Sequence, residues 1–275
     1  MSDCNNNCAA CGEDCPSRNA PQFFLKEHHP DAVVRRVFGV VSGKGGVGKS
    51  MVTCQLAVTL NRMGYRVGIM DADVTGPSIP QAFGLHEKAY GTADALLPCL
   101  SETGIQVISM NVLLDDETDP VIWRGPVIGG VVQQFWTDVI WDVDFLLVDM
   151  PPGTGDVTLN VFQQIPLNGI VVVTSPQELV SMIVEKAVNM AGMMKVPILG
   201  MVENMAYMIC PHCGERLSPF GKSRLEETAA AFGIRATAQM PIDPELAALC
   251  DGGRLEEYGQ EPLKALFRQI EEKLG

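Results

Sequence analysis

The sequence lacks both an excess of basic residues and any long apolar run. Its 275 residues contain 20 Lys and Arg against 33 Asp and Glu, which gives a net charge of -13. Proteins that bind nucleic acid or an anionic membrane over a broad face ordinarily carry the opposite charge. No apolar run approaches the ~18–20 residues that a membrane-spanning helix needs. We therefore expect neither nucleic acid nor a membrane as a partner.

The first fifteen residues, MSDCNNNCAACGEDC, also lack the pattern of a secretory signal peptide, because they have no basic start and no apolar stretch. Nine cysteines in such a chain indicate a reducing, cytoplasmic location, where clustered thiols hold metal more often than they form disulfides. Four cluster near the N-terminus, two form a CPHC motif, and three stand alone, as buried apolar residues usually do. These are Cys4, Cys8, Cys11 and Cys15; Cys210 and Cys213; and Cys54, Cys99 and Cys250.

Composition divides the chain into an arm, a linker and one large domain. Residues 1–20 are rich in Asn, Cys and Gly with little to bury, so we expect an arm that is disordered unless a ligand orders it. Residues 21–36 are interpreted as a linker. The domain covers 37–275, with the CPHC segment at 207–214, and the chain's 47% apolar content is enough for a sizeable core.

Within the domain, short and nearly continuous apolar runs alternate with helical patterns. Continuous apolar runs are typical of parallel strands buried on both faces. The alternation therefore predicts an α/β fold with a doubly wound, mostly parallel sheet. The expected strands are 37–42, 66–71, 105–110, 144–150, 169–175, 198–204 and 236–242, and helices are expected at 49–63, 178–194, 221–233 and 259–274.

A phosphate-binding motif follows the first predicted strand. GKGGVGKS, from Gly43 to Ser50, fits the G-x-x-x-x-G-K-[ST] pattern between a strand and a helix. Glycines allow backbone N–H groups to face an anion, and the helix N-terminus adds its dipole. Lys49 is expected to reach the β- and γ-phosphates and Ser50 to bind Mg²⁺. Lys44 adds a second cation where transition-state charge needs neutralising.

Acidic residues end two further predicted strands. Asp71 and Asp73 follow one strand, and Asp149 follows another. Ligands of open α/β sheets sit at this edge, where one carboxylate can hold Mg²⁺ and another can orient the attacking water. Gly153 and Gly155 give the segment after Asp149 the freedom of a switch loop. These positions predict one nucleotide site built from three loops.

These motifs together resemble a known family. GKGGVGKS resembles the deviant Walker A loop of the nitrogenase-iron-protein, MinD and ParA class of ATPases. DADVTGPSIP, VIWRGP, FLLVDMPPGTGDVTL, ILGMVENMAYMICPHCG and MPID resemble the Mrp/ApbC family of iron–sulfur cluster carriers. The resemblance covers about residues 36–260. It implies a P-loop ATPase that dimerises with itself or with a paralogue, binds [4Fe–4S] clusters and transfers them to apo-proteins.

The resemblance also implies individual roles. Lys44 would contact the phosphates of the partner subunit, Asp73 would position the hydrolytic water, Asp149 would be the Walker B carboxylate and Asn204 would contact adenine. The implied nucleotide site is Gly43, Lys44, Gly45, Gly46, Val47, Gly48, Lys49, Ser50, Met51 and Asn204, with Lys44, Lys49 and Asp73 catalytic and with Ser50, Asp73 and Asp149 around Mg²⁺.

The cysteines offer two sites for metal. Two thiolates cannot complete a four-thiolate cluster, but two chains that each supply Cys210 and Cys213 about a two-fold axis can. Zinc is the rival, because CPHCG is similar to a zinc-ribbon knuckle and His212 could serve as a ligand. The arm can ligate one cluster without a partner, although its cysteine spacing is tighter than in eukaryotic scaffold members. The arm ligands would be Cys4, Cys8, Cys11 and Cys15.

Three other functions stay open at this point. An electron-transfer ATPase like the nitrogenase iron protein would use the same residues. A ParA/MinD-type positioning ATPase would need a basic surface or membrane tail, but the amphipathic segment 261–275 has as many acidic as basic residues. A zinc-stabilised, nucleotide-dependent scaffold would bind metal without transferring a cluster.

Overall fold

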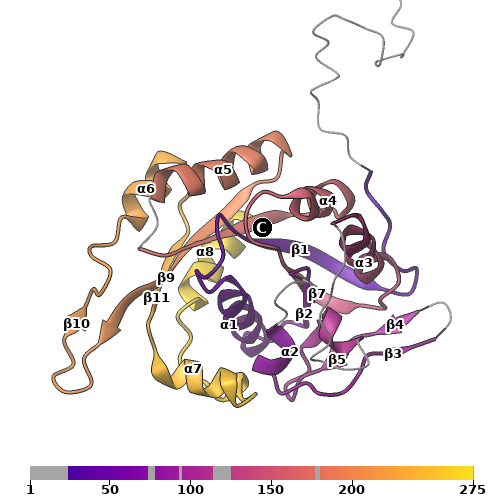
Figure 1. Ribbon diagram of the computed structural model, residues 1–275, viewed down its shortest axis with the longest axis horizontal. Helices are drawn as coiled ribbons and strands as arrows, with labels where there is room; N and C mark the ends of the chain where they lie inside the picture. Colours follow the sequence, from indigo (N-terminus) through magenta and orange to yellow (C-terminus); the bar gives the residue numbers. More distant parts are fainter. Residues whose placement is uncertain (1–23, 74–77, 93–94, 114–124, 177–179, 275) are drawn as a thin grey trace, which may run out of the picture.

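The computed structural model describes residues 24–73, 78–92, 95–113, 125–176 and 180–274 (Figure 1). The strands are β1 (Val33–Ser42), β2 (Val67–Asp71), β3 (Tyr90–Gly91), β4 (Leu96–Leu97), β5 (Cys99–Leu100), β6 (Gln106–Ile108), β7 (Asp142–Asp149), β8 (Gly169–Thr174), β9 (Ile198–Ile209), β10 (Arg216–Leu217) and β11 (Thr237–Pro241). The helices are α1 (Lys49–Arg62), α2 (Ile79–Ala82), α3 (Gly125–Thr137), α4 (Asp156–Gln164), α5 (Val180–Met193), α6 (Leu225–Ala231), α7 (Pro244–Asp251) and α8 (Lys264–Leu274), with 3-10 turns η1 (Met110–Val112) and η2 (Leu255–Glu257).

The predicted doubly wound sheet is confirmed. Among the described residues the strands follow the order β10-β9-β8-β1-β7-β2-β6-β5, and β11 pairs with β9. The pairs from β2–β6 through β1 to β9–β11 are parallel, while β5 and β10 add antiparallel edges. Strand β1 therefore lies near the middle of the sheet, with β7 and β8 on either side, and the loop that follows β1 is central.

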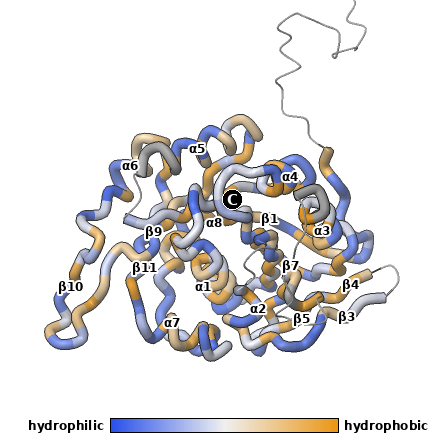
Figure 2. Tube along the Cα trace, viewed as in Figure 1, coloured by the Kyte–Doolittle hydropathy of each residue, from blue (hydrophilic) through white to orange (hydrophobic). Residues whose placement is uncertain are grey.

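Helices cover both faces of the sheet because its strands are apolar on both sides. In β1, Val37 and Val41 pack into the core under α3, α4, α5 and α6, whereas Phe38 and Val40 pack into the core under α1, α2, α7 and α8. Figure 1 shows the two helical layers around the sheet, and Figure 2 shows hydrophilic residues gathering in turns at the rim. This two-sided burial is what continuous apolar runs predict.

Several element boundaries differ from the predictions. Strand β1 starts at Val33, four residues inside the segment interpreted as a linker, and β9 continues to Ile209 instead of ending at residue 204. Helix α6 begins at Leu225, later than predicted. Helices α3, α4 and α7 were not predicted; α3 contains the pair Gly129–Gly130 and depends on packing of its apolar face more than on helix propensity.

The structure bears on the predicted arm and on membrane crossing to different extents. Cys4, Cys8, Cys11 and Cys15 lie outside the residues that the structure describes. Across the part of the chain that is described, no helix has both the length and the apolar character that a membrane crossing requires.

Candidate functional site

The phosphate-binding motif forms the loop between β1 and α1, at the carboxyl end of the central strand. Gly46 and Gly48 have φ angles of 82° and 76°, in the left-handed region that glycine adopts at little cost. Gly48 caps α1, and Lys49 is the first residue of that helix. Loop backbone and helix N-terminus thus form the concave arrangement that fits a phosphate group.

Asp149, at the end of β7, organises the side chains below the loop. Lys49 Nζ and Ser50 Oγ each donate to Asp149 Oδ2 at 2.6 Å, and Thr53 Oγ1 donates to Oδ1 at 2.6 Å. The carboxylate is fully buried, and the backbone of Asp149 is in register with Val40 of β1. A carboxylate and a hydroxyl are oxygen ligands suited to Mg²⁺, so this donor set fits that ion. The structure therefore brings Lys49, Ser50 and Asp149 together.

Thr53 belongs to this cluster although sequence analysis did not identify it. Its side chain is fully buried, and its hydroxyl also donates to the Lys49 carbonyl oxygen at 3.1 Å. The available signal is spacing, because a residue four positions after Lys49 lies on the same face of a helix. Thr53 therefore fixes the second oxygen of the Asp149 carboxylate.

The two aspartates after β2 have different surroundings. Lys49 Nζ lies 3.7 Å from Asp73 Oδ2, so Asp73 faces the phosphate-loop ammonium. Asp71 is buried, accepts from the Asp73 backbone N–H at 3.1 Å and accepts from Ser109 Oγ at 3.0 Å. Burial, and then the Asp149 carboxylate, raise the pKa of Asp71. Asp71 therefore shapes the turn that carries Asp73.

A bulge in β9 faces the same loop. Gln239 of β11 pairs with Glu203, and Pro241, two residues on, pairs with Tyr207. Between these pairs three residues of β9 lie opposite one residue of β11. Within the bulge Met205 has a φ of 55°. Such bulges bend a strand and redirect its side chains, often beside active sites.

The side chain that this bulge redirects is Asn204. Its Nδ2 donates to the Val47 carbonyl oxygen at 3.0 Å, and its Oδ1 accepts from the Met205 N–H at 2.9 Å. A Cβ at Gly48 would lie 2.2 Å from Asn204 Nδ2, so glycine there is needed for spacing as well as for its φ angle. Asn204 thus lies against the phosphate loop, 157 residues away in sequence from Val47.

Lys44 and Met51 lie at the two ends of the motif. Ser42 Oγ donates to the Lys44 carbonyl oxygen at 3.0 Å, which orders the start of the loop, and the side chain of Lys44 is half-buried. Its contact with phosphates of a partner subunit stays a prediction. The sulfur of Met51 accepts from the Cys250 thiol at 3.4 Å, and its contact with nucleotide stays a prediction.

The three lone cysteines are buried, as predicted. Cys54, Cys99 and Cys250 have exposed fractions of 2%, 8% and 7%. Burial, followed by Asp149, raises the pKa of Cys54, and burial raises the pKa of Cys250 to about 11. Thiols of this kind stay protonated at neutral pH and are poor metal ligands and nucleophiles.

The CPHC pair lies at the tip of the hairpin that joins β9 to β10. The Cys210 N–H donates to the Glu215 carbonyl oxygen at 2.9 Å, and the Gly214 N–H donates to the Cys210 carbonyl oxygen at 2.9 Å. The backbone N–H groups of Cys213 and His212, and the Cys213 side chain, hydrogen-bond to the Cys210 thiol and lower its pKa. A thiol that ionises readily on an exposed turn is suited to bind metal.

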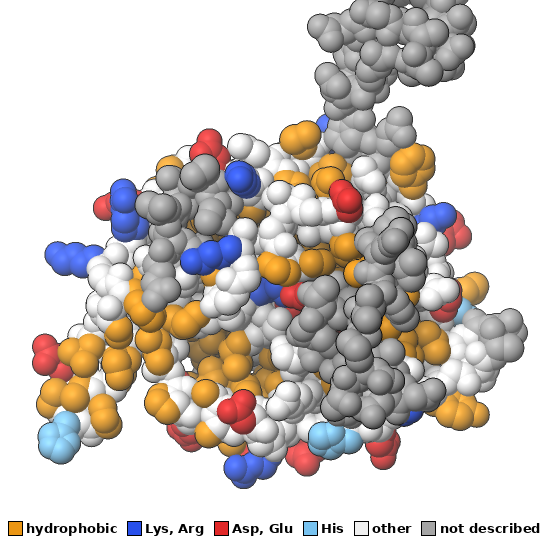
Figure 3. Space-filling model, in the orientation of Figure 1, with side chains coloured by type: hydrophobic (Ala, Val, Ile, Leu, Met, Phe, Trp, Pro, Cys, Tyr) orange, Lys and Arg blue, Asp and Glu red, His pale blue; other side chains and the backbone are white. Residues whose placement is uncertain are grey.

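The thiol pair is one half of a possible metal site. Among the described residues, no three His, Cys, Asp or Glu side chains come together as a metal site, so Cys210 and Cys213 offer two ligands. Ile209, Leu217 and Phe220 near them in sequence are exposed by 51%, 40% and 38%. Figure 3 shows hydrophobic side chains gathered at this end of the molecule. The hairpin thus combines thiols with an apolar surface that a second copy could cover.

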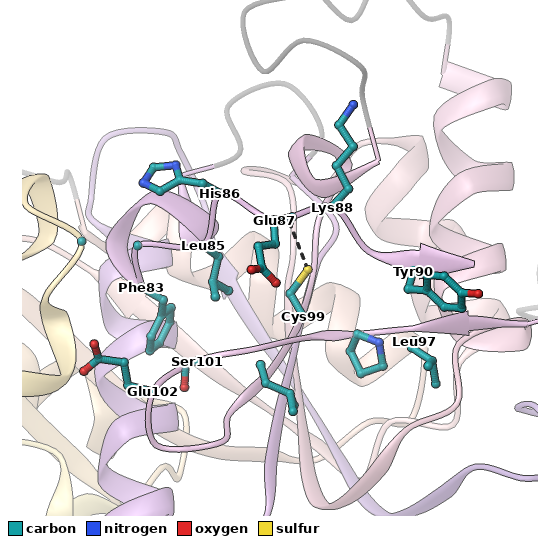
Figure 4. A pocket seen from close by; sticks show the side chains of 14 residues that line it. Phe83, Leu85, His86, Glu87, Lys88, Tyr90, Leu97, Cys99, Ser101 and Glu102 are labelled. Atoms are coloured by element: carbon teal, nitrogen blue, oxygen red, sulfur yellow. Dashed lines mark hydrogen bonds between the residues drawn. The ribbon is translucent and has the colours of Figure 1, made fainter. Parts of the chain in front are cut away.

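A cavity of about 580 Å³ lies away from the phosphate loop. Among the described residues it is lined by 83–88, Tyr90, 97–102 and Gly253 (Figure 4). In it the Cys99 thiol donates to the Glu87 carbonyl oxygen at 3.4 Å, and burial raises the pKa of Cys99. Its size alone does not make it the site of chemistry, because the convergent charges lie at the phosphate loop.

Comparison with known proteins agrees with this geometry. The ParA family profile, for NUBPL iron-transfer P-loop NTPases, matches residues 33–275. An iron-sulfur cluster carrier protein of Clostridium perfringens is 47% identical over 244 residues, covering 85% of this chain and 86% of the relative. One of Methanocaldococcus jannaschii is 37% identical over 289 residues, covering 100% of this chain and 98% of the relative.

Solved structures show the same relationship. A nucleotide-binding protein from Archaeoglobus fulgidus, in complex with ADP, is 44% identical with a TM-score of 0.76, covering 84% of this chain and 91% of that chain. The cell division ATPase MinD of Pyrococcus furiosus, 22% identical with a TM-score of 0.59 over 87% of this chain and 99% of its own, shares the fold. The family match across nearly the whole described chain shows that this protein belongs to the NUBPL iron-transfer P-loop NTPase family.

Proposed function

We propose that the protein is an ATP-dependent iron–sulfur carrier that holds a [4Fe–4S] cluster as cargo between two copies and delivers it to apo-proteins. The observation that carries this proposal is the Cys210–Cys213 turn, whose thiols are presented at the end of the strand that also contacts the phosphate loop. The relatives named as iron–sulfur cluster carriers support the same conclusion. Function in the cytoplasm is part of the proposal, since reduced thiols are maintained there.

The nucleotide half of the proposal uses the cluster around Asp149. Lys49 would exchange its contacts with Asp149 and Asp73 for phosphate oxygens, and Ser50 and Asp149 would hold Mg²⁺ directly or through water. Bound Mg²⁺ would neutralise charge on the phosphates. Asp73, at 3.7 Å from the Lys49 ammonium, would orient the attacking water. Asn204 would contact the adenine.

The cluster half requires a second subunit, identical or a paralogue. Each chain would contribute Cys210 and Cys213, and the exposed apolar side chains beside them would be covered in the dimer. Lys44 would reach the phosphates of the partner subunit, so that ATP binding and cluster binding both depend on the dimer. The arm cysteines Cys4, Cys8, Cys11 and Cys15 would hold a further cluster.

Anaerobic reconstitution with iron and sulfide tests the proposal. Iron and sulfide bound per chain, absorption near 400 nm and transfer to an apo-ferredoxin are measured together. The arm cysteines are first replaced by serine, so that only the hairpin cluster is followed. In this background we expect the bound iron to be lost in Cys210→Ser, retained in the control Cys99→Ala, and delivered to the acceptor in a nucleotide-dependent way. Zinc in place of iron would overturn the proposal in favour of a zinc-stabilised scaffold.

Two further outcomes separate the remaining functions. Reversible, ATP-coupled reduction without cluster loss to the acceptor would favour an electron-transfer ATPase. Pelleting with liposomes or DNA, and no iron, would favour a positioning ATPase.

A further inference from the structure

Four side chains bracket the β9 bulge and connect it to the cysteine hairpin. We name this group, Glu203, Tyr207, Arg216 and Gln239, the clamp. Gln239 Nε2 donates to Glu203 Oε2 at 3.1 Å, and the Arg216 guanidinium donates to Gln239 Oε1. The Arg216 guanidinium carbon also lies 3.7 Å from the centre of the Tyr207 ring. The clamp therefore joins β9, β10 and β11.

The inner end of the clamp adjoins the phosphate loop. Glu203 is 1% exposed and directly precedes Asn204, whose amide donates to the Val47 carbonyl oxygen. Any movement of the loop that shifts Asn204 must be taken up by the adjacent bulge, where Met205 already has a left-handed conformation. Extra residues in a bulge leave the ladder locally unpaired, so this is the part of β9 best able to change.

The outer end of the clamp adjoins the thiols. Tyr207 precedes Cys210 by three residues, and Arg216 is the cross-strand partner of Ile209, the residue before Cys210. A guanidinium stacked on an aromatic ring and hydrogen-bonded at its edge has a defined orientation. Arg216 therefore ties the hairpin that carries the thiols to both sides of the bulge.

We propose that Arg216 is a positioning residue that couples the nucleotide-dependent position of Asn204 to the position of Cys210 and Cys213. This rests on the proposed function for its nucleotide and its cargo. The hairpin itself does not need the clamp to form, because backbone hydrogen bonds at Cys210 and Gly214 and the β9–β10 pairs fix its register. The clamp adds a connection to the strand beside the phosphate loop.

The test uses the full chain without metal. Alkylation of Cys210 and Cys213 by iodoacetamide is followed by peptide mass spectrometry, with and without MgATP, alongside ATP hydrolysis. In the unmodified protein we expect MgATP to change the alkylation rate of the pair. In Arg216→Ala we expect the ratio of rates with and without MgATP to fall to about one, with hydrolysis retained. Arg224→Ala, which removes an exposed Arg that pairs with Glu227, is the matched control and should keep the ratio.

Two more variants distinguish coupling from folding. Gln239→Ala leaves the Arg216–Tyr207 stack but removes the link to Glu203, and it should also lose the nucleotide effect. Arg216→Lys keeps a cation over Tyr207 and should therefore restore part of the effect of MgATP on the alkylation rate. An undiminished MgATP effect in Arg216→Ala or in Gln239→Ala, or no effect in the unmodified protein, overturns the proposal. The proposed function is tested by a different measurement: it fails if the protein holds no iron after reconstitution.

Discussion

The phosphate loop and the cysteine hairpin differ in how completely one chain builds each of them. At the loop, Lys49 and Asp149 are buried, and three side chains contact one carboxylate at 2.6 Å. At the hairpin, Cys213 is exposed, the paired strand β10 has two residues, and two thiols stand where a cluster needs four ligands. The first region is preorganised within one chain, whereas the second supplies two of the four ligands that the proposed cluster needs.

Substitution of Lys49 tests the preorganised region most severely. Lys49→Ala removes the cation that would neutralise phosphate charge, and losses of about 10²–10³-fold are typical when such a preorganised donor is removed. We expect ATP hydrolysis to fall by about that factor, while iron reconstituted at the hairpin stays unchanged. The control is Lys264→Ala, a partly exposed lysine paired with Glu261. Hydrolysis within twofold of the unmodified protein would contradict the assigned role.

Substitution of either of two loop glycines should have a smaller effect, on the free energy of unfolding. Gly46→Ala places a side chain at φ 82° with nothing within 4 Å, so it should cost about 1–2 kcal/mol of unfolding free energy. Gly48→Ala has the same backbone problem and also displaces Asn204, so we expect an additional loss of about 1 kcal/mol from that hydrogen bond.

Urea denaturation of the two variants measures the difference. Adding Asn204→Ala to Gly48→Ala should cost little more, because the hydrogen bond of Asn204 to Val47 is already lost in Gly48→Ala. Equal unfolding free energies for Gly46→Ala and Gly48→Ala would show that Asn204 does not pack against the loop as described.

The smallest predicted effect concerns the pH dependence of thiol reactivity. N–H groups directed at Cys210 lower its pKa, whereas burial raises the pKa of Cys250 to about 11. A lower pKa gives more thiolate at neutral pH. Alkylation of Cys210 in the metal-free protein should therefore reach its midpoint at a lower pH than alkylation of Cys250. Mass-spectrometric rate profiles with a common midpoint would contradict this contrast.

Local patterns predicted much of the fold and of the phosphate site. The strand–loop–helix setting and the acidic strand ends were enough to place Lys49, Ser50 and Asp149 together, because the carboxyl ends of parallel strands share one edge. The spacing of Cys210 and Cys213 likewise predicted that the two thiols lie close together on one segment, and their binding of metal stays a prediction. These features depend on residues close in sequence or on the general geometry of the fold.

Features that depend on distant packing were not predictable. The mostly apolar run at 198–204 gives no sign that β9 extends to Ile209 through a bulge, since the bulge arises from its pairing with β11. Glu203 and Gln239 are 36 residues apart and meet only across that pairing. Helix α3 has poor intrinsic propensity, and tertiary packing of Phe135 and Trp136 stabilises it instead.

In the proposed dimer, two copies share one cluster through their Cys210–Cys213 turns. Native mass spectrometry under anaerobic conditions, on a reconstituted variant whose arm cysteines are all replaced by serine, tests it directly. We predict a dimer that carries four iron atoms in total and that separates into iron-free monomers in Cys213→Ser. An iron-loaded monomer, or a dimer whose iron survives Cys213→Ser, would contradict the claim.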